Sequence, residues 1–206
     1  MSLTEDQIIR YSRQILLAQI GGRGQETLLV CGAQLVGRGA AQATAAAYLA
    51  AGGIPVRAAV QPNAKVRSDE TGLLFAGAEV GQPFALAFTR AAADLNPDAL
   101  SDTSCGLLGE VPADFSGSAP WVALGWRQGR GEVVYRSERG CAECFRGQLG
   151  GLTNVPPGPQ SVLVGTVGAL VFQRLCLGAS DDLGLVTTDR EGELQAAPVN
   201  PCSRCA

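Results

Sequence analysis

Four cysteines in two C-x-x-C pairs are the residues whose types and spacing most clearly indicate chemistry. Cys141 and Cys144 form one pair, and Cys202 and Cys205 form the other. Four thiolates on two tight turns match the tetrahedral sulfur shell that zinc prefers. A fully cysteine-ligated zinc has no open position for water, so such a site holds structure and does no chemistry. The spacing predicts a zinc that ties the end of the chain back to its middle.

Other uses of these cysteines are two disulfides, an iron–sulfur cluster or a redox pair. The first residues of the chain do not read as a secretory signal, which disfavours disulfides. Cys31, Cys105 and Cys176 lie in apolar surroundings, as reduced core thiols do. We therefore expect reduced cysteines, a structural zinc and a cytoplasmic protein.

The length and composition of the chain limit which classes of protein it can belong to. A chain of 206 residues suits one α/β domain, here 1–206, and a net charge of −3 without a basic stripe argues against nucleic-acid binding. The absence of histidine removes His-based acid–base and Ser-His-Asp chemistry. The longest apolar run, 161–177, contains Gln173 and Arg174, so we expect a buried helix and no membrane span. We expect Leu170 and Phe172 to lie in the core, and a second chain to cover part of this helix.

Hydrophobic periodicity predicts alternating strands and helices. An amphipathic N-terminal helix begins at the cap Thr4 and ends at Gly21, Gly22 and Gly24. Further helices are expected near 39–51, 82–95 and 161–177. Strands are expected near 28–31, 54–60, 104–108, 122–125, 132–135, 184–188 and 193–199. This order predicts one continuous α/β layer structure.

A glycine-containing turn, Gly32 to Gly37, follows the first expected strand, where a Rossmann-like fold places its phosphate loop. It does not fit G-x-G-x-x-G, because Gln34 replaces the second glycine, and a frame starting at Gly37-x-Gly39 moves the match into the expected helix. We interpret the turn as a tight connection with close helix packing in preference to a nucleotide site.

Several segments together resemble the ThiF/MoeB/HesA family, the bacterial relatives of ubiquitin-activating enzymes. They are R-Y-S-R-Q-I-L-L-A-Q-I-G-G-R-G-Q-E at 10–26, L-F-A-G-A-E-V-G-Q-P-F-A, L-N-P-D at 95–98, C-A-E-C, V-G-T-V-G-A-L-V-F-Q from Val164, and C-S-R-C. The resemblance implies a Rossmann-like α/β fold with a mixed sheet flanked by helices, usually dimeric, with a four-cysteine zinc. It further implies an N-terminal helical arm at 1–26 and a zinc-stapled part at 141–206. Members use ATP and magnesium to adenylate the C-terminal glycine of a ubiquitin-like or sulfur-carrier protein.

The chain departs from the family at the nucleotide site. The family's G-x-G-G-L-G loop is matched by 32–37, and its magnesium aspartate has no counterpart. Neutral residues stand at the positions of its ribose acid, its phosphate-binding asparagine and arginine, and its lysine. The resemblance therefore implies a vestigial cleft with no catalytic residues, where ATP and magnesium are not expected and where Phe84 packs into the phosphate space. Its residues are Gly32, Gln34, Gly37, Val60 or Gln61, Ser68, Thr71 and Phe84.

Arg10 and Arg13 keep the family spacing. In the family, the arginine matched by Arg13 reaches across the dimer into the partner's nucleotide site. The alternative is that both arginines are solvated, or that they pair with Glu5 or Asp6.

Three functions follow as hypotheses. The first is a noncatalytic subunit or scaffold, a homodimer or a heterodimer with an active paralogue, in activation of a ubiquitin-like or sulfur-carrier protein. The second is a recognition module that binds a carrier protein or a peptide precursor. The third is an active adenylyltransferase that uses Asp69, Glu70 or Asp102 for its metal.

Overall fold

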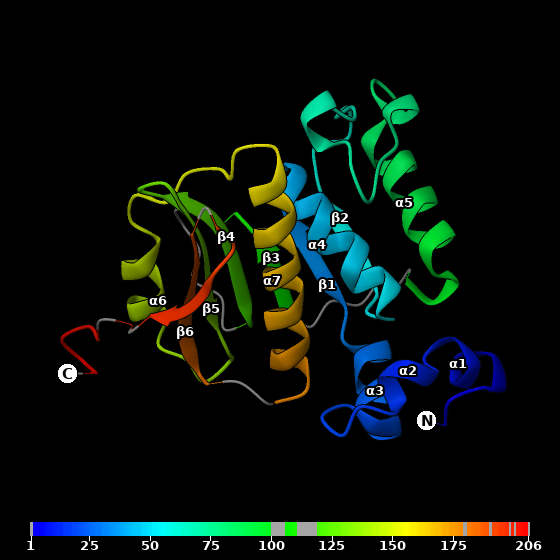
Figure 1. Ribbon diagram of the computed structural model, residues 1–206, viewed down its shortest axis with the longest axis horizontal. Coiled ribbons are helices and arrows are strands. Elements are labelled where there is room, and N and C mark those ends of the chain that lie inside the picture. The colour runs from blue at the N-terminus through cyan, green and yellow to red at the C-terminus, as the bar shows by residue number, and fades with distance from the viewer. Residues whose placement is uncertain are drawn as a thin grey trace.

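A mixed seven-stranded sheet organises the chain, which a computed structural model describes at residues 2–99, 106–110, 119–178, 181–189, 191–197, 199 and 201–205 (Figure 1). Cys105 and Asp102 lie outside these residues. The strand order is β2-β1-β3-β4-β5-β6-β7. Strands β1 to β4 are parallel, and β4 to β7 are antiparallel. The strands are β1 Ala33–Val36, β2 Val56–Ala59, β3 Gly106–Gly109, β4 Trp121–Arg127, β5 Arg130–Arg136, β6 Leu183–Thr188 and β7 Leu194–Ala197.

Helices cover both faces of this sheet (Figure 1). On one face, α4 Ala40–Ala51 packs beside α7 Pro159–Cys176, and α5 Phe84–Leu95 lies beyond α4. On the other face, α6 Ala142–Leu149 covers β5 and buries Phe145 against Trp121 and Val134. Short 3-10 helices are Ser68–Glu70, Gly77–Glu79 and Pro97–Ala99. The fold is the mixed, helix-flanked α/β sheet that the sequence predicts.

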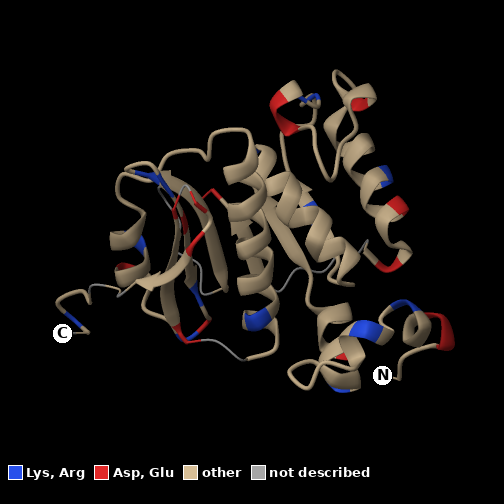
Figure 2. Ribbon diagram, viewed as in Figure 1, with Lys and Arg blue, Asp and Glu red and all other residues tan. Residues whose placement is uncertain are grey.

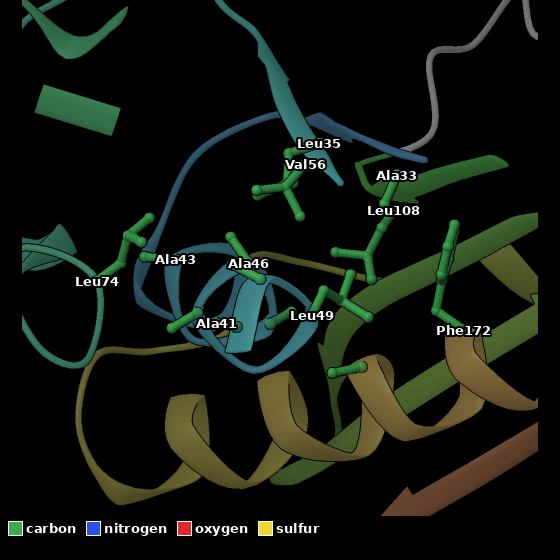
Figure 3. Close-up of a cluster of buried hydrophobic side chains, with 14 of the residues drawn as sticks. Ala33, Leu35, Ala41, Ala43, Ala46, Leu49, Val56, Leu74, Leu108 and Phe172 are labelled. Atoms are coloured by element: carbon green, nitrogen blue, oxygen red, sulfur yellow. The ribbon is translucent and has the colours of Figure 1, made fainter. Parts of the chain in front are cut away.

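The main core lies between α4, α7 and the parallel strands (Figure 3). Alanines make up most of α4, and their small side chains let α7 approach closely. Gly165 of α7 lies against the carbonyl oxygen of Ala41, where a Cβ would collide with it. Phe172 is buried as expected, but Leu170 is 53% exposed, so the expectation that Leu170 belongs to the core is wrong.

Figure 2 shows that α7 is almost free of charge, and its one charged residue, Arg174, lies near its C-terminal end. Among the described residues, no helix combines the length and hydropathy that crossing a bilayer requires.

The N-terminal segment differs from the prediction. Thr4 caps α1 Glu5–Arg10 as expected, but α2 Ser12–Ile15 and α3 Gly21–Val30 are separate helices. Gly21, Gly22 and Gly24 begin α3 and do not end a helix. The run 28–31 is the end of α3 and not a strand, because helical spacing buries Gln25 and Leu28 on one side. A run of four apolar residues is too short for its periodicity to distinguish a strand from the end of a helix.

Tyr11 anchors this segment to the rest of the chain. Its ring is 1% exposed, and its hydroxyl donates to Asp98 Oδ2 at 2.9 Å and accepts from Asn96 Nδ2 at 2.7 Å. Asn96 Nδ2 also donates to the carbonyl of Ala50 at the end of α4. Gly53, with φ at 87°, lies against the Tyr11 ring, where a Cβ would be 2.9 Å from Cζ. The Tyr11 hydroxyl thus links the N-terminal helices to α4 and to the turn after α5.

Cys31 and Cys176 form a disulfide, with Cα atoms 6.2 Å apart. The expectation that both are reduced core thiols is therefore wrong. The bond joins the residue after α3 to the last residue of α7, a pairing that spans 145 positions of sequence.

We expect Tyr11→Phe to lower the free energy of unfolding by about 1–2 kcal/mol, because Asn96 and Asp98 lose a buried partner while the ring is kept. Urea titration of both proteins measures this change. Tyr48→Phe is the matched control, since Tyr48 is 44% exposed on α4. Equal losses in the two variants would contradict the anchoring role.

Candidate functional site

A cleft lies at the carboxyl ends of the parallel strands β1, β2 and β3. Its volume is about 600 Å³, and it is lined by Gly37, Arg38, Ala59, Val60, Gln61, Arg67, Glu110 and Asn154. Open parallel sheets bind ligands at this edge, where the connections from neighbouring strands diverge. The strand order β2-β1-β3 places that divergence at the end of β1.

The glycine loop of this cleft is Gly37–Gly39, not the expected turn at 32–37. Strand β1 occupies 33–36, so Gly32 precedes the strand and Gln34 lies within it, where it accepts a hydrogen bond from Arg57 of β2. The loop joins β1 directly to α4, with φ at 79° for Gly37 and 150° for Gly39. Because β1 lies five residues later than the predicted strand at 28–31, the frame that starts at Gly37, set aside in the sequence argument, is the one in the loop.

In this frame, 37–42 reads G-R-G-A-A-Q, with Gln42 at the third glycine of the dinucleotide fingerprint. That glycine normally allows close packing of helix on strand. Gln42 is buried, and Gly109 of β3 makes room for it, since a Cβ on Gly109 would be 3.3 Å from Gln42 Cγ.

Arg38 is the cation of the glycine loop, and a buried carboxylate holds it. Glu70 is 1% exposed and accepts from Arg38 Nε at 2.7 Å. Arg38 Nη2 also donates to Glu70 and to the carbonyl of Lys65. The guanidinium lies 4.7 Å from the centre of the Phe84 ring. Its charge is therefore neutralised within the protein.

The other two charged residues of the cleft are Arg67 and Glu110. Arg67 Nε pairs with Asp69 Oδ1 at 3.0 Å, and its Nη2 lies 3.7 Å from Glu70 Oε1. The Glu110 carboxylate lies directly over the glycine loop, since a Cβ on Gly37 would be 2.7 Å from Glu110 Oε1. Among the described residues, Glu110 has no ion-pair partner. The cleft thus presents an unpaired acid where backbone N–H groups before a helix would meet a phosphate.

The structure brings together only some of the expected cleft residues. Gly37, Val60 and Gln61 line the cleft, and Arg38, Arg67, Glu110 and Asn154 join them unexpectedly. Ser68 and Thr71 bond to each other on the neighbouring 3-10 helix, through Thr71 Oγ1 and the Ser68 carbonyl. Phe84 is buried beneath the loop, packed against Phe75 and Phe88. Arg38 and Glu110 could have been predicted from the sequence, because each follows closely on the end of a parallel strand, β1 or β3.

The two N-terminal arginines have different surroundings. Arg10 Nη1 pairs with Asp98 Oδ2 at 2.7 Å, and not with Glu5 or Asp6. Arg13 is exposed on α2 and has no ion pair with another described residue. Exposed apolar side chains lie nearby in sequence: Ile8 (50%), Ile9 (68%), Leu16 (84%) and Leu17 (51%).

The four cysteines lie together at the start of α6, at the end of the molecule opposite the N-terminal helices. Cys141 caps α6 and Cys144 lies in its first turn, while Cys202 and Cys205 belong to the last turn of the chain. All four Sγ atoms lie within 4.8 Å of one another, and Cys141 Sγ is 3.7 Å from Cys202 Sγ. Sulfurs around a tetrahedral zinc are about 3.8 Å apart, because each Zn–S bond is about 2.3 Å. The cluster therefore fits a tetrahedral metal ion.

Hydrogen bonds to sulfur set the ionisation of this cluster. The Cys144 backbone N–H, followed by the Cys205 and Cys144 thiols, lowers the pKa of Cys141 to about 6. The pKa of Cys205 is raised to about 12, chiefly by its hydrogen bond with Cys141. The Cys202 N–H also donates to Cys144 Sγ at 3.1 Å. Without a metal one thiolate forms first and its neighbours keep their protons, so binding a cation at all four sulfurs releases protons.

Arg136 is a residue of this region that the sequence did not suggest. It is 3% exposed, its Nη2 donates to the carbonyl of Ala119 at 3.0 Å, and its Nη1 lies 3.4 Å from the carbonyl of Gly140. Burial lowers the pKa of Arg136, and the nearby Cys141 opposes that change. Arg136 thus places a buried positive charge near Cys141.

Comparisons with known proteins agree with this architecture. PaaA matches with a TM-score of 0.71 at 14% identity, over 95% of this chain and 84% of PaaA. Escherichia coli MccB, solved with AMPCPP and MccA, matches with a TM-score of 0.68 at 14% identity, over 96% and 73% of the two chains. These likenesses establish the ThiF/MoeB-type fold.

In sequence, the chain is similar to mouse adenylyltransferase and sulfurtransferase MOCS3, with 45% identity over 53 residues. That segment is 26% of this chain and only 12% of the mouse protein. No family model matches the chain. The partial match and the shared fold support the ThiF/MoeB resemblance.

We expect purified protein to hold one equivalent of a divalent metal, measured by elemental analysis. Cys202→Ser should release the metal and lower the melting temperature by roughly 10 °C, because metal-binding energy at such sites is folding energy. Acidification should also release it, because protons compete with the metal for the four thiolates. Ser203→Ala, in the same turn, should change neither quantity. Metal-free wild-type protein with an unchanged melting temperature would contradict the site.

Proposed function

We propose that this chain, which has the ThiF/MoeB-type fold, is a noncatalytic subunit or scaffold in the activation of a ubiquitin-like or sulfur-carrier protein. The observation that carries the proposal is the charge of the cleft. Arg38 and Arg67 are paired with Glu70 and Asp69, and Glu110 adds over the glycine loop a carboxylate that has no ion pair with any residue the structure describes.

Adenylation concentrates negative charge at the phosphates and needs cations or a metal to stabilise it. In this cleft the cations are already neutralised, and the free charge has the wrong sign. Val60 and Gln61, at the end of β2, offer no carboxylate for a ribose. These features support a cleft that does not hold ATP and magnesium productively.

An active enzyme with relocated metal ligands has less support. Glu70 is buried in its pair with Arg38, and Asp69 is paired with Arg67. Taking Glu70 for a metal would break its buried pair with Arg38, which is costly, and taking Asp69 would leave Arg67 with only its 3.7 Å contact to Glu70. Asp102, the third candidate, lies outside the described residues.

We further propose that the metal is zinc, held by Cys141, Cys144, Cys202 and Cys205. Four sulfur ligands at tetrahedral spacing favour zinc over harder cations. The ion would staple the last turn of the chain to α6, and Arg136 would offset part of the charge of the four thiolates.

The partner surface of this proposal is the N-terminal segment. Ile8, Ile9, Leu16 and Leu17 expose apolar area around α1 and α2, which a second chain would cover. Arg13 is exposed among them, whereas Arg10 is tied to Asp98. We propose that Arg13 serves the phosphates of a partner's site, as arginines supplied in trans do in other phosphate chemistry. In the recognition-module hypothesis the same surface binds a partner, but Arg13 contacts no nucleotide phosphate.

Calorimetry with ATP and magnesium should show no binding tighter than about 1 mM. Glu110→Gln should strengthen binding of ATP or pyrophosphate about fivefold, because removing one unit charge about 4 Å away is worth about 1 kcal/mol in water. Glu191→Gln makes the same change of net charge in the turn between β6 and β7 and should have no effect. Micromolar affinity of the wild-type protein for ATP would refute the proposal.

Arg13→Ala should leave the melting temperature and metal content unchanged, because its side chain is exposed. In a complex reconstituted with an active paralogue, it should slow carrier-dependent pyrophosphate exchange by about tenfold or more. Arg23→Ala, an exposed arginine of α3, is the control. Equal exchange rates for wild type and Arg13→Ala would favour the recognition module.

A further inference from the structure

The disulfide between Cys31 and Cys176 opens onto a cavity of about 330 Å³. This cavity lies at the amino ends of β3 and β4, where Gly106 begins one strand and Pro120 precedes the other. The glycine-loop cleft lies at the carboxyl ends of the strands, so the two sites are on opposite edges of the sheet. Both cysteines are only partly buried.

The lining of the cavity is mixed. Phe172 and Leu175 of α7 provide apolar contact, while Ser137, Glu138 and Arg139 from the segment after β5 are polar. Cys31 and Cys176 both line this cavity, and both residues are partly exposed, so a small polar solute that enters the cavity meets the two cysteines.

The six cysteines within the described residues fall into two classes. The four cluster cysteines are free thiols within 4.8 Å of one another, and Cys31 and Cys176 are joined. A partly exposed disulfide is the kind that small thiols can reach and reduce, whereas a metal protects cluster thiolates from oxidation.

We propose that Cys31–Cys176 is a thiol–disulfide exchange site for a low-molecular-weight thiol that enters through this cavity. The thiolate of the small molecule attacks one sulfur, forming a mixed disulfide and releasing the other cysteine as a thiolate. A second small thiol attacks the mixed disulfide, leaving two protein thiols and one small-molecule disulfide. The reverse steps, started by that small-molecule disulfide, restore the bond.

Thiol–disulfide exchange at this site would change how the end of α3 is attached to the rest of the fold. The disulfide ties the end of α3 to the end of α7, and Leu177 Cδ2 lies 3.2 Å from the Cβ position of Gly24 in α3. Reduction removes the covalent tie and leaves α3 held by packing and by the hydrogen bond from Gln25 Nε2 to the Gly52 carbonyl. We expect reduction to loosen α1 to α3, which carry Arg13 and the exposed apolar residues, and to leave the cysteine cluster intact.

Peptide mapping tests this proposal with glutathione as the probe. Native wild-type protein, purified without reductant and alkylated, should yield tryptic peptides 24–38 and 175–190 as a linked pair, because each contains one cysteine. Millimolar reduced glutathione should convert the pair to free, alkylated peptides, with a glutathione adduct on one of them at intermediate times. Excess oxidised glutathione should restore the link, and the metal content should stay constant.

Two variants keep the proposal falsifiable. After treatment with oxidised glutathione and removal of free thiol, Cys31→Ser should carry one glutathione on peptide 175–190, and Cys176→Ser should carry one on 24–38, because each variant has lost the protein thiol that would resolve the mixed disulfide. When the wild-type protein is reduced with glutathione, amide hydrogen exchange in α1 to α3 should become faster. In Cys31→Ser, which has no disulfide to reduce, reduced glutathione should leave the exchange rates of α1 to α3 unchanged. The readouts need no nucleotide or partner, so they are independent of the proposed function.

Two outcomes would overturn the proposal. One is full alkylation of both peptides in protein treated with oxidised glutathione, which would mean that the bond does not form. The other is a linked pair that resists glutathione in the native protein and yields only after unfolding, which would make it a closed structural disulfide.

Discussion

The buried carboxylate of Glu70 is the constraint on which the cleft depends. A carboxylate that is 1% exposed requires partners, and it finds them in the Arg38 guanidinium and the Arg67 backbone N–H. The same contacts hold the Arg38 guanidinium over the Phe84 ring and close the 3-10 turn at 68–70. The electrostatics of the cleft are thus part of the folded state, because freeing Arg38 for a ligand would leave the buried Glu70 with only the Arg67 backbone N–H and a 3.7 Å contact to Arg67 Nη2.

The N-terminal segment and the cysteine cluster lie at opposite ends of the molecule. The N-terminal segment is anchored by Tyr11, which joins it to α4 and to Asp98, while the cysteine cluster holds the last turn of the chain near α6 (Figure 1). Between them, α4 and α7 pack closely through alanine and glycine and support the strands whose ends form both cavities. The positions of the N-terminal segment and of the cysteine cluster therefore do not depend on whether the cleft between them binds a nucleotide.

The sequence was most informative where one local signal was strong. Helix α4 and most strands fall within a few residues of their predicted positions, because an alanine run and short apolar runs between turns admit few other structures. It was least informative at 28–37. There an apolar run ends a helix, and the true strand contains Gln34, whose amide is paired with Arg57 of the next strand. No local pattern shows such a cross-strand partner.

By itself, the sequence determined the α/β order of elements and the two cysteine pairs that can close on a metal, because spacing within C-x-x-C places both sulfurs on one turn. Only the tertiary structure decided the frame of the glycine loop, the pairing of Arg38 with Glu70, the position of Glu110 over Gly37, and the joining of Cys31 to Cys176. Each depends on residues far apart in the chain, whose distance is set by how the helices pack on the sheet and not by any local preference.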